Sequence, residues 1–261
     1  SGIGGLIKRD DNTLTLSGAN TYEGVTVVAK GVLSVANNSA LGSTAQGTEI
    51  RSGAILSLQN GVAVTGETVR IVGNGDNYGA IQAAANSTSV WNGPVLLDSN
   101  AGPWSPRIGT GANGVLTVAG PIMNGNTGSH AYFSGNGTTG RVILTTNSSY
   151  TGLTGIIRGI VQLGADDALP TTTRLILNVA AIATDASTFD LAGFNQTVAA
   201  LGSGTGHPCL ITNSTATLST LTVNQSTTNT TYGGAIAGAV SLVKTGSAVL
   251  VLTNQTTHTG P

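Results

Sequence analysis

Aspartates are the residues of this chain with the most obvious catalytic potential, and four of them stand in two pairs. Cleavage of a polysaccharide needs two carboxylates a few ångström apart, or a Ca²⁺ cluster with a basic residue. Asp10-Asp11 and Asp166-Asp167 lie between runs of strand-forming residues, where aspartate commonly makes turns. We therefore interpret the pairs as turn residues and expect no catalytic residue in the chain. The single aspartates considered with them are Asp76, Asp98, Asp185 and Asp190.

Histidine and cysteine offer little for a metal site or for nucleophilic catalysis. His130, His207 and His258 are scattered, and Cys209 follows His207 by two positions. A closed zinc site takes four ligands, so this pair supplies half a site at most and we expect no bound metal. Cys209 is the only cysteine, so it cannot form an internal disulfide. As a nucleophile it would need a base that the sequence does not identify.

Two glycine motifs resemble nucleotide-binding loops, from Gly109 to Gly114 and from Gly135 to Gly140. Each is followed by β-branched residues typical of a strand, not by the helix whose N-terminus would hold a pyrophosphate. In a chain with 38 glycines we interpret both as chance matches and predict no cofactor. Ten Lys and Arg against eleven Asp and Glu leave no basic stripe for phosphates, which argues against nucleic-acid binding.

Aromatic residues could build one kind of binding site, a platform for sugars, because sugars stack on ring faces. Trp91, Trp104 and Tyr78 are the plausible members in a chain with only 4% aromatic residues. A carbohydrate-binding or polysaccharide-cleaving module therefore stays open as the alternative to a structural role.

The elements that carry these residues are short strands. Runs such as Val32–Val35 and Ile55–Leu58 are rich in β-branched and aliphatic residues and are bounded by Gly, Asn or Ser, while no sustained helical period occurs. Only 8% of residues are charged, against roughly 25% in an ordinary domain, and Thr, Ser and Asn take their place. With 39% hydrophobic residues the chain can bury a core, so the sequence predicts a folded, all-β protein.

An internal repeat decides among all-β folds. Thr21–Gly24 (Thr-Tyr-Glu-Gly) recurs as Ser149–Gly152 (Ser-Tyr-Thr-Gly) at an offset of 128 in sequence number, and a third copy, Thr257–Gly260, follows at a further offset of 108. The summed offset of 236 also aligns Leu6-Ile7-Lys8 with Leu242-Val243-Lys244. Stacked units are therefore expected instead of a sandwich or a closed barrel.

These observations predict a right-handed parallel β-helix that is continuous over residues 1–261. Its repeat units are expected at about 5–138 and 139–241, with a partial third unit at 242–261. With about 20 residues per coil and about 4.8 Å per coil, roughly a dozen coils would make a rod about 60 Å long. Val, Leu, Ile and Ala should form inward ladders, and Asn should form hydrogen-bonded ladders at turns. Aromatic side chains are expected to be too bulky for the narrow interior.

The repeat resembles a known family. Asn12–Gly24, preceded by Leu6-Ile7-Lys8 and followed by Gly31-Val32-Leu33 and Ser39–Gly42, is similar to the autotransporter-associated β-strand repeat, or passenger-associated transport repeat, of bacterial surface proteins. The resemblance covers residues of about 5–60, 139–200 and 240 onward. It implies a parallel β-helix, export across the bacterial envelope and a role as stalk, adhesin or fibre. His258 departs from the pattern, because the other two copies have tyrosine.

The sequence thus favours a structural, non-enzymatic scaffold at the bacterial cell surface or outside the cell. The expected partner is the chain itself, through head-to-tail stacking of β-helix ends, or further repeats of the same polypeptide, with surface glycans as a second class. Neither nucleic acid nor a direct membrane span is expected. The residues expected to shape the repeat turns are Tyr22, Gly24, Gly31, Leu41, Tyr150, Gly152, Gly159, Leu169, His258 and Gly260.

Overall fold

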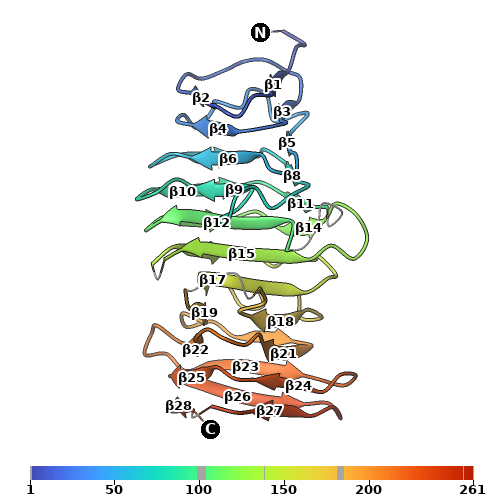
Figure 1. Cartoon of the computed structure of the whole chain (residues 1–261), viewed down its shortest axis with the longest axis vertical. Coiled ribbons are helices and arrows are strands. Elements are labelled where there is room, and N and C mark those ends of the chain that lie inside the picture. The colour runs from blue at the N-terminus through green and yellow to red at the C-terminus, as the bar shows by residue number, and fades with distance from the viewer. Residues whose placement is uncertain (1, 99–103, 138, 181–184, 255, 261) are drawn as a thin grey trace.

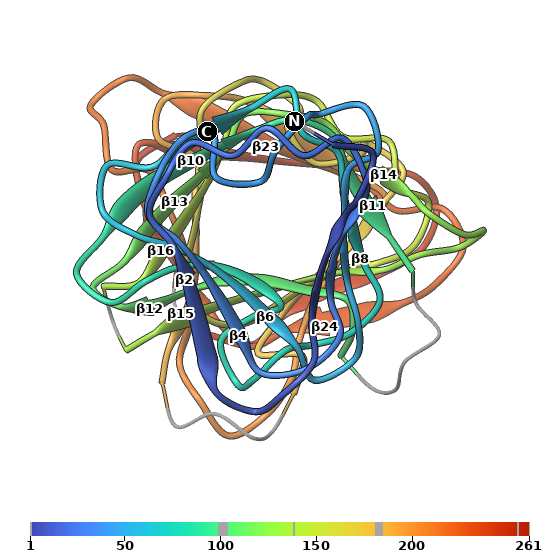
Figure 2. The same ribbon diagram turned by 90° about the horizontal axis from the view of Figure 1, so that it is seen from above.

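The computed structural model is a right-handed parallel β-solenoid of about ten turns, and the residues that it describes form no helix, as the sequence predicted. It describes residues 2–98, 104–137, 139–180, 185–254 and 256–260. The coils follow one another along the long axis from the N-terminus to the C-terminus (Figure 1). Seen from the N-terminal end, the chain winds clockwise as it recedes, which gives the right-handed sense (Figure 2).

Three main sheet faces enclose the core, and the paired strands of the described residues are all parallel. Face one contains β1 (Leu6–Lys8), β3 (Thr26–Val28), β5 (Thr48–Ile50), β8 (Val69–Ile71), β11 (Val95–Leu97) and β14 (Ile122–Asn124). Face two contains β2 (Thr13–Leu16), β4 (Val32–Val35), β6 (Ile55–Leu58), β9 (Ile81–Ala83), β12 (Arg107–Ala112), β15 (Ala131–Asn136), β17 (Thr154–Leu163), β18 (Arg174–Leu177) and β21 (Ala200–Ser203).

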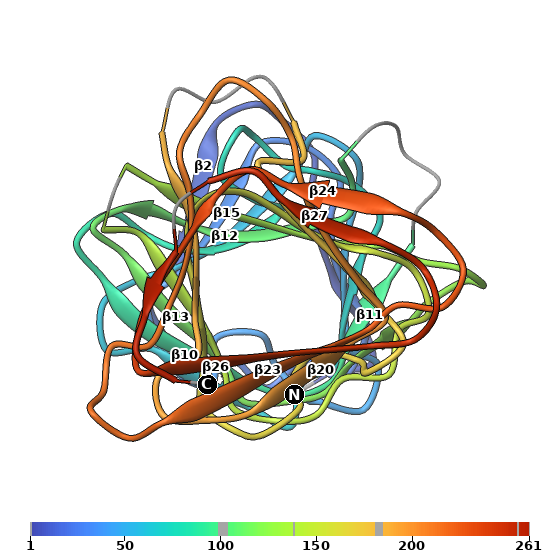
Figure 3. The same ribbon diagram turned by 90° about the horizontal axis from the view of Figure 1, so that it is seen from below.

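Face three begins two coils later, in the coil of β5 and β6, and continues to the C-terminal end. It contains β7 (Ala63–Thr65), β10 (Thr88–Asn92), β13 (Val115–Val118), β16 (Arg141–Leu144), the second half of β17, β19 (Ser187–Asp190), β22 (Cys209–Thr212), β25 (Ala235–Gly238) and β28 (Thr257–His258). The C-terminal coils add β20 (Gln196–Val198), β23 (Ser219–Asn224) and β26 (Val240–Thr245), and the pair β24 (Thr230–Tyr232) and β27 (Leu250–Leu252). Figure 3 shows these last strands from the C-terminal end.

The strand register explains why the core is continuous. On face two, residues in register on successive strands point inward and stack as an apolar ladder that runs through Leu33, Leu56, Ile81, Ile108, Phe133 and Ile156, each at most 1% exposed. One hydrophobic cluster extends from Val28 to Val240. Because side chains alternate with period two, a one-residue slip would turn such a ladder outward, so the apolar pattern fixes the register.

Coil length varies along the chain. Arg141 lies opposite Ile160 on the next coil, whereas Gly159 lies opposite Ser187. The second of these coils therefore contains clearly more residues than the first. The expectation that aromatic side chains are too bulky for the interior was wrong. Aromatic residues dominate the largest fully buried side chains: Trp91, Phe133, Tyr150, Phe189 and Tyr232.

Candidate functional site: the repeat turn

The repeated tyrosine makes the same hydrogen bond in both copies. Tyr22 Oη lies 2.6 Å from Thr26 Oγ1, and Tyr150 Oη lies 2.5 Å from Thr154 Oγ1. Tyr150 is fully buried and Tyr22 half-buried, and burial raises the pKa of both phenols. The tyrosine therefore closes the turn onto the first residue of the following strand. Its threonine partner was not among the predicted site residues, although Thr26 and Thr154 show the same sequence offset as the two tyrosines.

The glycine that follows this tyrosine is required by close contact between coils. The backbone N–H of Gly24 donates to Gly4 O at 3.0 Å, that of Gly152 to Ser129 O at 3.0 Å, and that of Gly260 to Val240 O at 3.2 Å. A Cβ at Gly24 would lie 2.7 Å from Gly5 N, and a Cβ at Gly260 would lie 2.5 Å from Val240 O. At Gly152 it would overlap Ser129 O and the His130 ring. In all three copies the backbones meet where only hydrogen fits.

The second repeated glycine is required by conformation. Gly31 has φ +69° and Gly159 has φ +74°, a region in which side chains with a Cβ are strained. Leu41 and Leu169 are buried in the core. At the tyrosine position of the third copy, His258 Nδ1 lies 3.1 Å from Gly260 O, within its own turn. These contacts are those of a coil corner, and none of them positions a side chain for catalysis or for binding a ligand.

Asparagine side chains join successive coils at the corners. Asn86 and Asn113 both have positive φ, and Asn113 Nδ2 donates to Asn86 Oδ1 at 3.0 Å. Thr139 Oγ1 in turn donates to Asn113 Oδ1, so three coils are linked as the sequence suggested. Elsewhere an asparagine oxygen accepts a backbone N–H of the next coil, as in Asn60 to Thr88 at 3.0 Å and Asn229 to Val249 at 2.8 Å.

The paired aspartates lie in turns, and the carboxylates of Asp11, Asp166 and Asp167 bond to lysine or backbone partners. Asp11 pairs with Lys30 at 2.8 Å on the surface. Asp166 and Asp167 accept the backbone N–H groups of Asn195 and Thr197 in the next coil, at 2.6 Å and 2.7 Å. These bonds make the second pair a structural bridge between coils.

The single aspartates are bound to protein groups as well. Asp76 Oδ1 accepts the N–H groups of its own turn, and Asp190 Oδ1 accepts two backbone N–H groups. Asp98 pairs with Arg70 at 2.5 Å, and Asp185 Oδ2 lies 3.9 Å from Arg158.

The remaining candidates for chemistry are also accounted for by local structure. His130 Nδ1 accepts the Leu153 N–H at 2.9 Å, and burial lowers the pKa of His130. Cys209 is buried, its Sγ accepts from Ser187 Oγ at 3.6 Å, and burial raises the pKa of its thiol, which disfavours the thiolate. Within the described ranges no three His, Cys, Asp or Glu side chains gather as a metal site. Gly109 lies against the backbone of the coils on both sides.

The proposed aromatic platform was wrong in one of its three members. Trp91 is fully buried because its side chain points inward on β10, where its neighbours, the half-buried Val90 and the exposed Asn92, point outward.

Trp104 and Tyr78 lie instead on the outer side of face two, in what we call the lateral cluster: Tyr78, Trp104, Arg107, Tyr132 and Arg158. Trp104 packs against Tyr132 and Ile157, and Arg158 lies 4.8 Å from the centre of the Tyr78 ring.

Two arginines, the buried Arg107 and the half-buried Arg158, hold the lateral cluster together. Arg107 is 1% exposed and donates to Asp76 O at 3.2 Å and to Trp104 O at 3.4 Å. Burial, with Arg158 nearby, lowers its pKa to about 10. Arg158 Nη2 donates to Asn77 O at 2.8 Å. The guanidinium groups thus tie surface loops to the sheet, a role that the sequence pattern gave no reason to expect.

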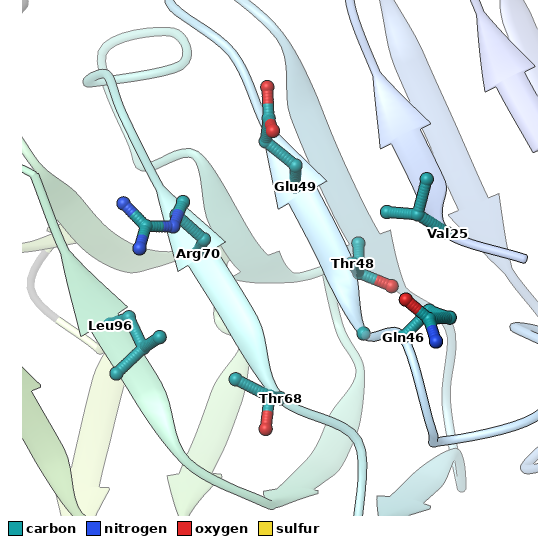
Figure 4. Close-up of a pocket in the computed structure, with 8 residues that line it drawn as sticks. Val25, Gln46, Thr48, Glu49, Thr68, Arg70 and Leu96 are labelled. Atoms are coloured by element: carbon teal, nitrogen blue, oxygen red, sulfur yellow. The ribbon is translucent and has the colours of Figure 1, made fainter. Parts of the chain in front are cut away.

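A shallow depression of ≈ 150 Å³ lies on the outer side of face one (Figure 4). Its two charged groups point to other partners, since Glu49 binds Arg51 at 2.8 Å and Arg70 binds Asp98. Small-molecule sites usually measure about 300–1,000 Å³, so this depression supports no ligand. It is lined by Val25, Gln46, Gly47, Thr48, Glu49, Thr68, Arg70 and Leu96.

Comparison with known proteins agrees with the geometry of the turns. A family model described as the passenger-associated-transport-repeat matches residues 6–35, 139–163 and 242–261. The chain carries passenger-associated transport repeats. The tyrosine turn at Tyr22 lies inside the first transport repeat, the turn at Tyr150 inside the second, and His258 inside the third.

One curated relative adds a protein context for the transport repeat. The adhesin BmaC autotransporter of Brucella suis biovar 1 (strain 1330) is 38% identical over 73 residues, which are 28% of this chain and 2% of the adhesin. The match therefore spans a small fraction of that protein. No solved structure was found to match the chain. In the described part of the chain, no helix has the length and apolar character needed to cross a membrane.

Proposed function

We propose that this chain is a rigid, non-enzymatic scaffold segment of a bacterial passenger protein that acts outside the cell or on its surface. The observation that carries the proposal is the transport-repeat turn, which recurs with the same tyrosine–threonine bond and the same glycine contact along one continuous core. Such a column of parallel sheets resists bending, because each coil is hydrogen-bonded to its neighbours along several faces.

The fate of the polar side chains supports a structural role. Asp166 and Asp167 accept backbone N–H groups, Asp11 pairs with a surface lysine, and asparagines such as Asn113 join coils. An active carboxylate pair would instead need free oxygens facing a shared space. The relative named as an adhesin supports the further proposal that the scaffold presents an adhesive surface.

Surface display tests the proposal. The chain would be inserted in the passenger position of a bacterial autotransporter and detected with an antibody on intact cells. We expect labelling of intact cells and a rod-shaped particle in small-angle scattering of the purified chain. A version without the export leader is the matched control and should be labelled only after lysis. Labelling that needs lysis in both cases, or a compact particle, would overturn the proposal.

The lateral cluster favours a second candidate, carbohydrate binding, since Trp104 and Tyr78 lie outside the main core beside two arginines. A glycan array tests it with the full chain and with Trp104→Ala and Tyr78→Ala. Binding that both substitutions remove would support this function. Turnover of a polysaccharide that is lost in Asp166→Asn would instead support the enzymatic alternative.

A further inference from the structure

Several asparagines of this chain are followed directly by glycine, the pairing in which asparagine loses its side-chain amide most easily. Glycine has no Cβ that would keep its backbone nitrogen away from the preceding side chain, and asparagine is among the thermolabile residues. The pairs are Asn60–Gly61, Asn74–Gly75, Asn92–Gly93, Asn113–Gly114, Asn124–Gly125 and Asn136–Gly137. The last of them adjoins residue 138, which lies outside the described residues.

Loss of the amide needs freedom in both residues of the pair. The backbone nitrogen of the glycine must approach Cγ of the asparagine closely and in line. The asparagine side chain therefore has to rotate, and the glycine N–H must not be held by an acceptor. An asparagine that is bonded to a neighbouring coil is protected for as long as the chain is folded.

The ladders at the coil corners protect two of these pairs. Asn60 Oδ1 accepts the Thr88 N–H at 3.0 Å, and the Gly61 N–H donates to Thr88 O at 2.9 Å. Asn113 is held by its two side-chain bonds to neighbouring coils, and the Gly114 N–H donates within its own turn at 3.0 Å. In both pairs the side chain and the glycine nitrogen are occupied.

Two further pairs are held on the sheet faces. Asn124 Oδ1 accepts the Thr151 N–H at 3.1 Å, and the Gly125 N–H donates to the end of β11 at 2.7 Å. Asn92 is the last residue of β10, and its carbonyl accepts a backbone N–H of the preceding coil at 2.8 Å. Gly93 is buried against the backbone of that coil, so this peptide cannot turn toward the Asn92 side chain.

The pair Asn74–Gly75 differs from these four. Both residues are half-buried in the loop between β8 and β9. Within the described part of the chain, neither the Asn74 side chain nor the Gly75 N–H has a hydrogen-bond partner. The loop is anchored on either side of the pair, because Gly73 O accepts the Arg107 N–H at 3.2 Å and Asp76 Oδ1 accepts the N–H groups of the following turn.

We propose that Asn74 is a site of spontaneous deamidation in the folded chain. The Gly75 nitrogen forms a bond to Asn74 Cγ, the Cγ–Nδ2 bond breaks, and the proton of the Gly75 N–H leaves with the amide nitrogen as ammonia. Water then opens the cyclic imide at either carbonyl, which gives aspartate or isoaspartate at position 74. This modification goes beyond the proposed scaffold role and does not depend on it.

The product changes the loop that holds the lateral cluster. The carbonyls of Asp76 and Asn77 accept from Arg107 and Arg158. Isoaspartate adds a methylene to the backbone and a carboxylate beside it, so these carbonyls should shift away from the guanidinium groups. A buried charge that loses a partner is destabilising, and Arg107 is buried. The modified chain should therefore unfold at a lower urea concentration.

Peptide mapping by mass spectrometry, over a time course of the folded chain at pH 8.5 and 37 °C, is the test. We expect the amide of Asn74 to convert to the acid at least about tenfold faster than that of the four held asparagines, because groups kept out of reacting distance lose that much rate or more. A tryptic digest incubated in the same way is the control. There the five rates should converge, since the contacts between coils are gone.

The matched variant is Asn74→Gln, whose longer side chain closes a ring far more slowly. Fresh wild type and fresh Asn74→Gln should unfold at the same urea midpoint, and after incubation the wild type should unfold at the lower one. Conversion of Asn74 that is no faster than that of Asn60 or Asn113 in the folded chain would overturn the proposal. Equal midpoints of the two incubated chains would overturn the effect on the lateral cluster.

Discussion

The carboxyl group of Glu67 should make this solenoid more stable in acid than at neutral pH. Glu67 is 1% exposed. Its Oε1 accepts from Thr48 Oγ1 at 2.7 Å, and its Oε2 is buried without a hydrogen-bond partner. None of the four ion pairs found among the described residues includes it. Burial raises its pKa above the ordinary value of 4.5.

The sign follows from proton linkage. A carboxyl whose pKa is higher in the folded than in the unfolded chain binds its proton more tightly when folded. Its favourable contribution is complete below the unfolded pKa and is lost as pH rises through the folded pKa. A buried polar group without a partner costs about 1–3 kcal/mol, and more when charged. Glu67→Gln should therefore raise the free energy of unfolding by about 1–2 kcal/mol at pH 7.5 and leave it nearly unchanged at pH 4.

Urea unfolding followed by tryptophan fluorescence measures this effect close to its source. Trp91 is buried in the coil that follows Glu67, and Gly93 of that coil lies against the Glu67 backbone. Glu49→Gln is the matched control, because Glu49 is half-buried and paired with Arg51. A wild-type midpoint that stays level or rises between pH 4 and pH 7.5, with Glu67→Gln parallel to it, would refute the reasoning.

Three further predictions concern the bonds between coils. Gly152→Ala should destabilise the chain by about 1–3 kcal/mol through overlap with Ser129 O, whereas Gly18→Ala, with open space around it, should be neutral in thermal unfolding. Asn113→Gly, which keeps the positive φ accessible and removes two side-chain bonds, should cost about 1–2 kcal/mol in urea unfolding, and no loss would contradict the ladder. Raising NaCl from 50 mM to 1 M should shift the melting temperature by less than about 2 °C, because exposed ion pairs contribute little, and a larger drop would mean that charge holds the coils together.

The fold could be predicted from the sequence because each repeated residue type is required by a contact or by the backbone at its position. Equivalent positions of the first two copies have the same backbone environment. Tyr22 and Tyr150 therefore each bond to the threonine four residues later, and Gly24 and Gly152 each contact the backbone of the preceding coil. Aspartates between strands were correctly interpreted as turn residues, since backbone N–H groups at a coil corner need acceptors.

Side-chain direction at irregular coils could not be predicted in the same way. Along Thr88–Asn92 (Thr-Ser-Val-Trp-Asn), either alternating set could face inward, because one set offers Trp91 with Ser89 and the other offers Val90 with two polar residues. The set with Trp91 faces inward because burying a tryptophan removes far more apolar area from water than burying a valine. The lateral cluster was equally hidden, since it joins loops that are far apart in the sequence, such as those of Asn77 and Arg158.

The same physics that makes the rod stiff leaves it little freedom to host chemistry. An active site needs polar groups that are held in place yet unsatisfied until substrate arrives. At several coil corners the opposite holds, because side chains that could serve, such as Asp167 and Asn113, are already bonded to the neighbouring coil. Freeing one of them for a ligand would break a bond between coils. Function in such a column is therefore expected where loops leave the stacked coils, as they do at the lateral cluster.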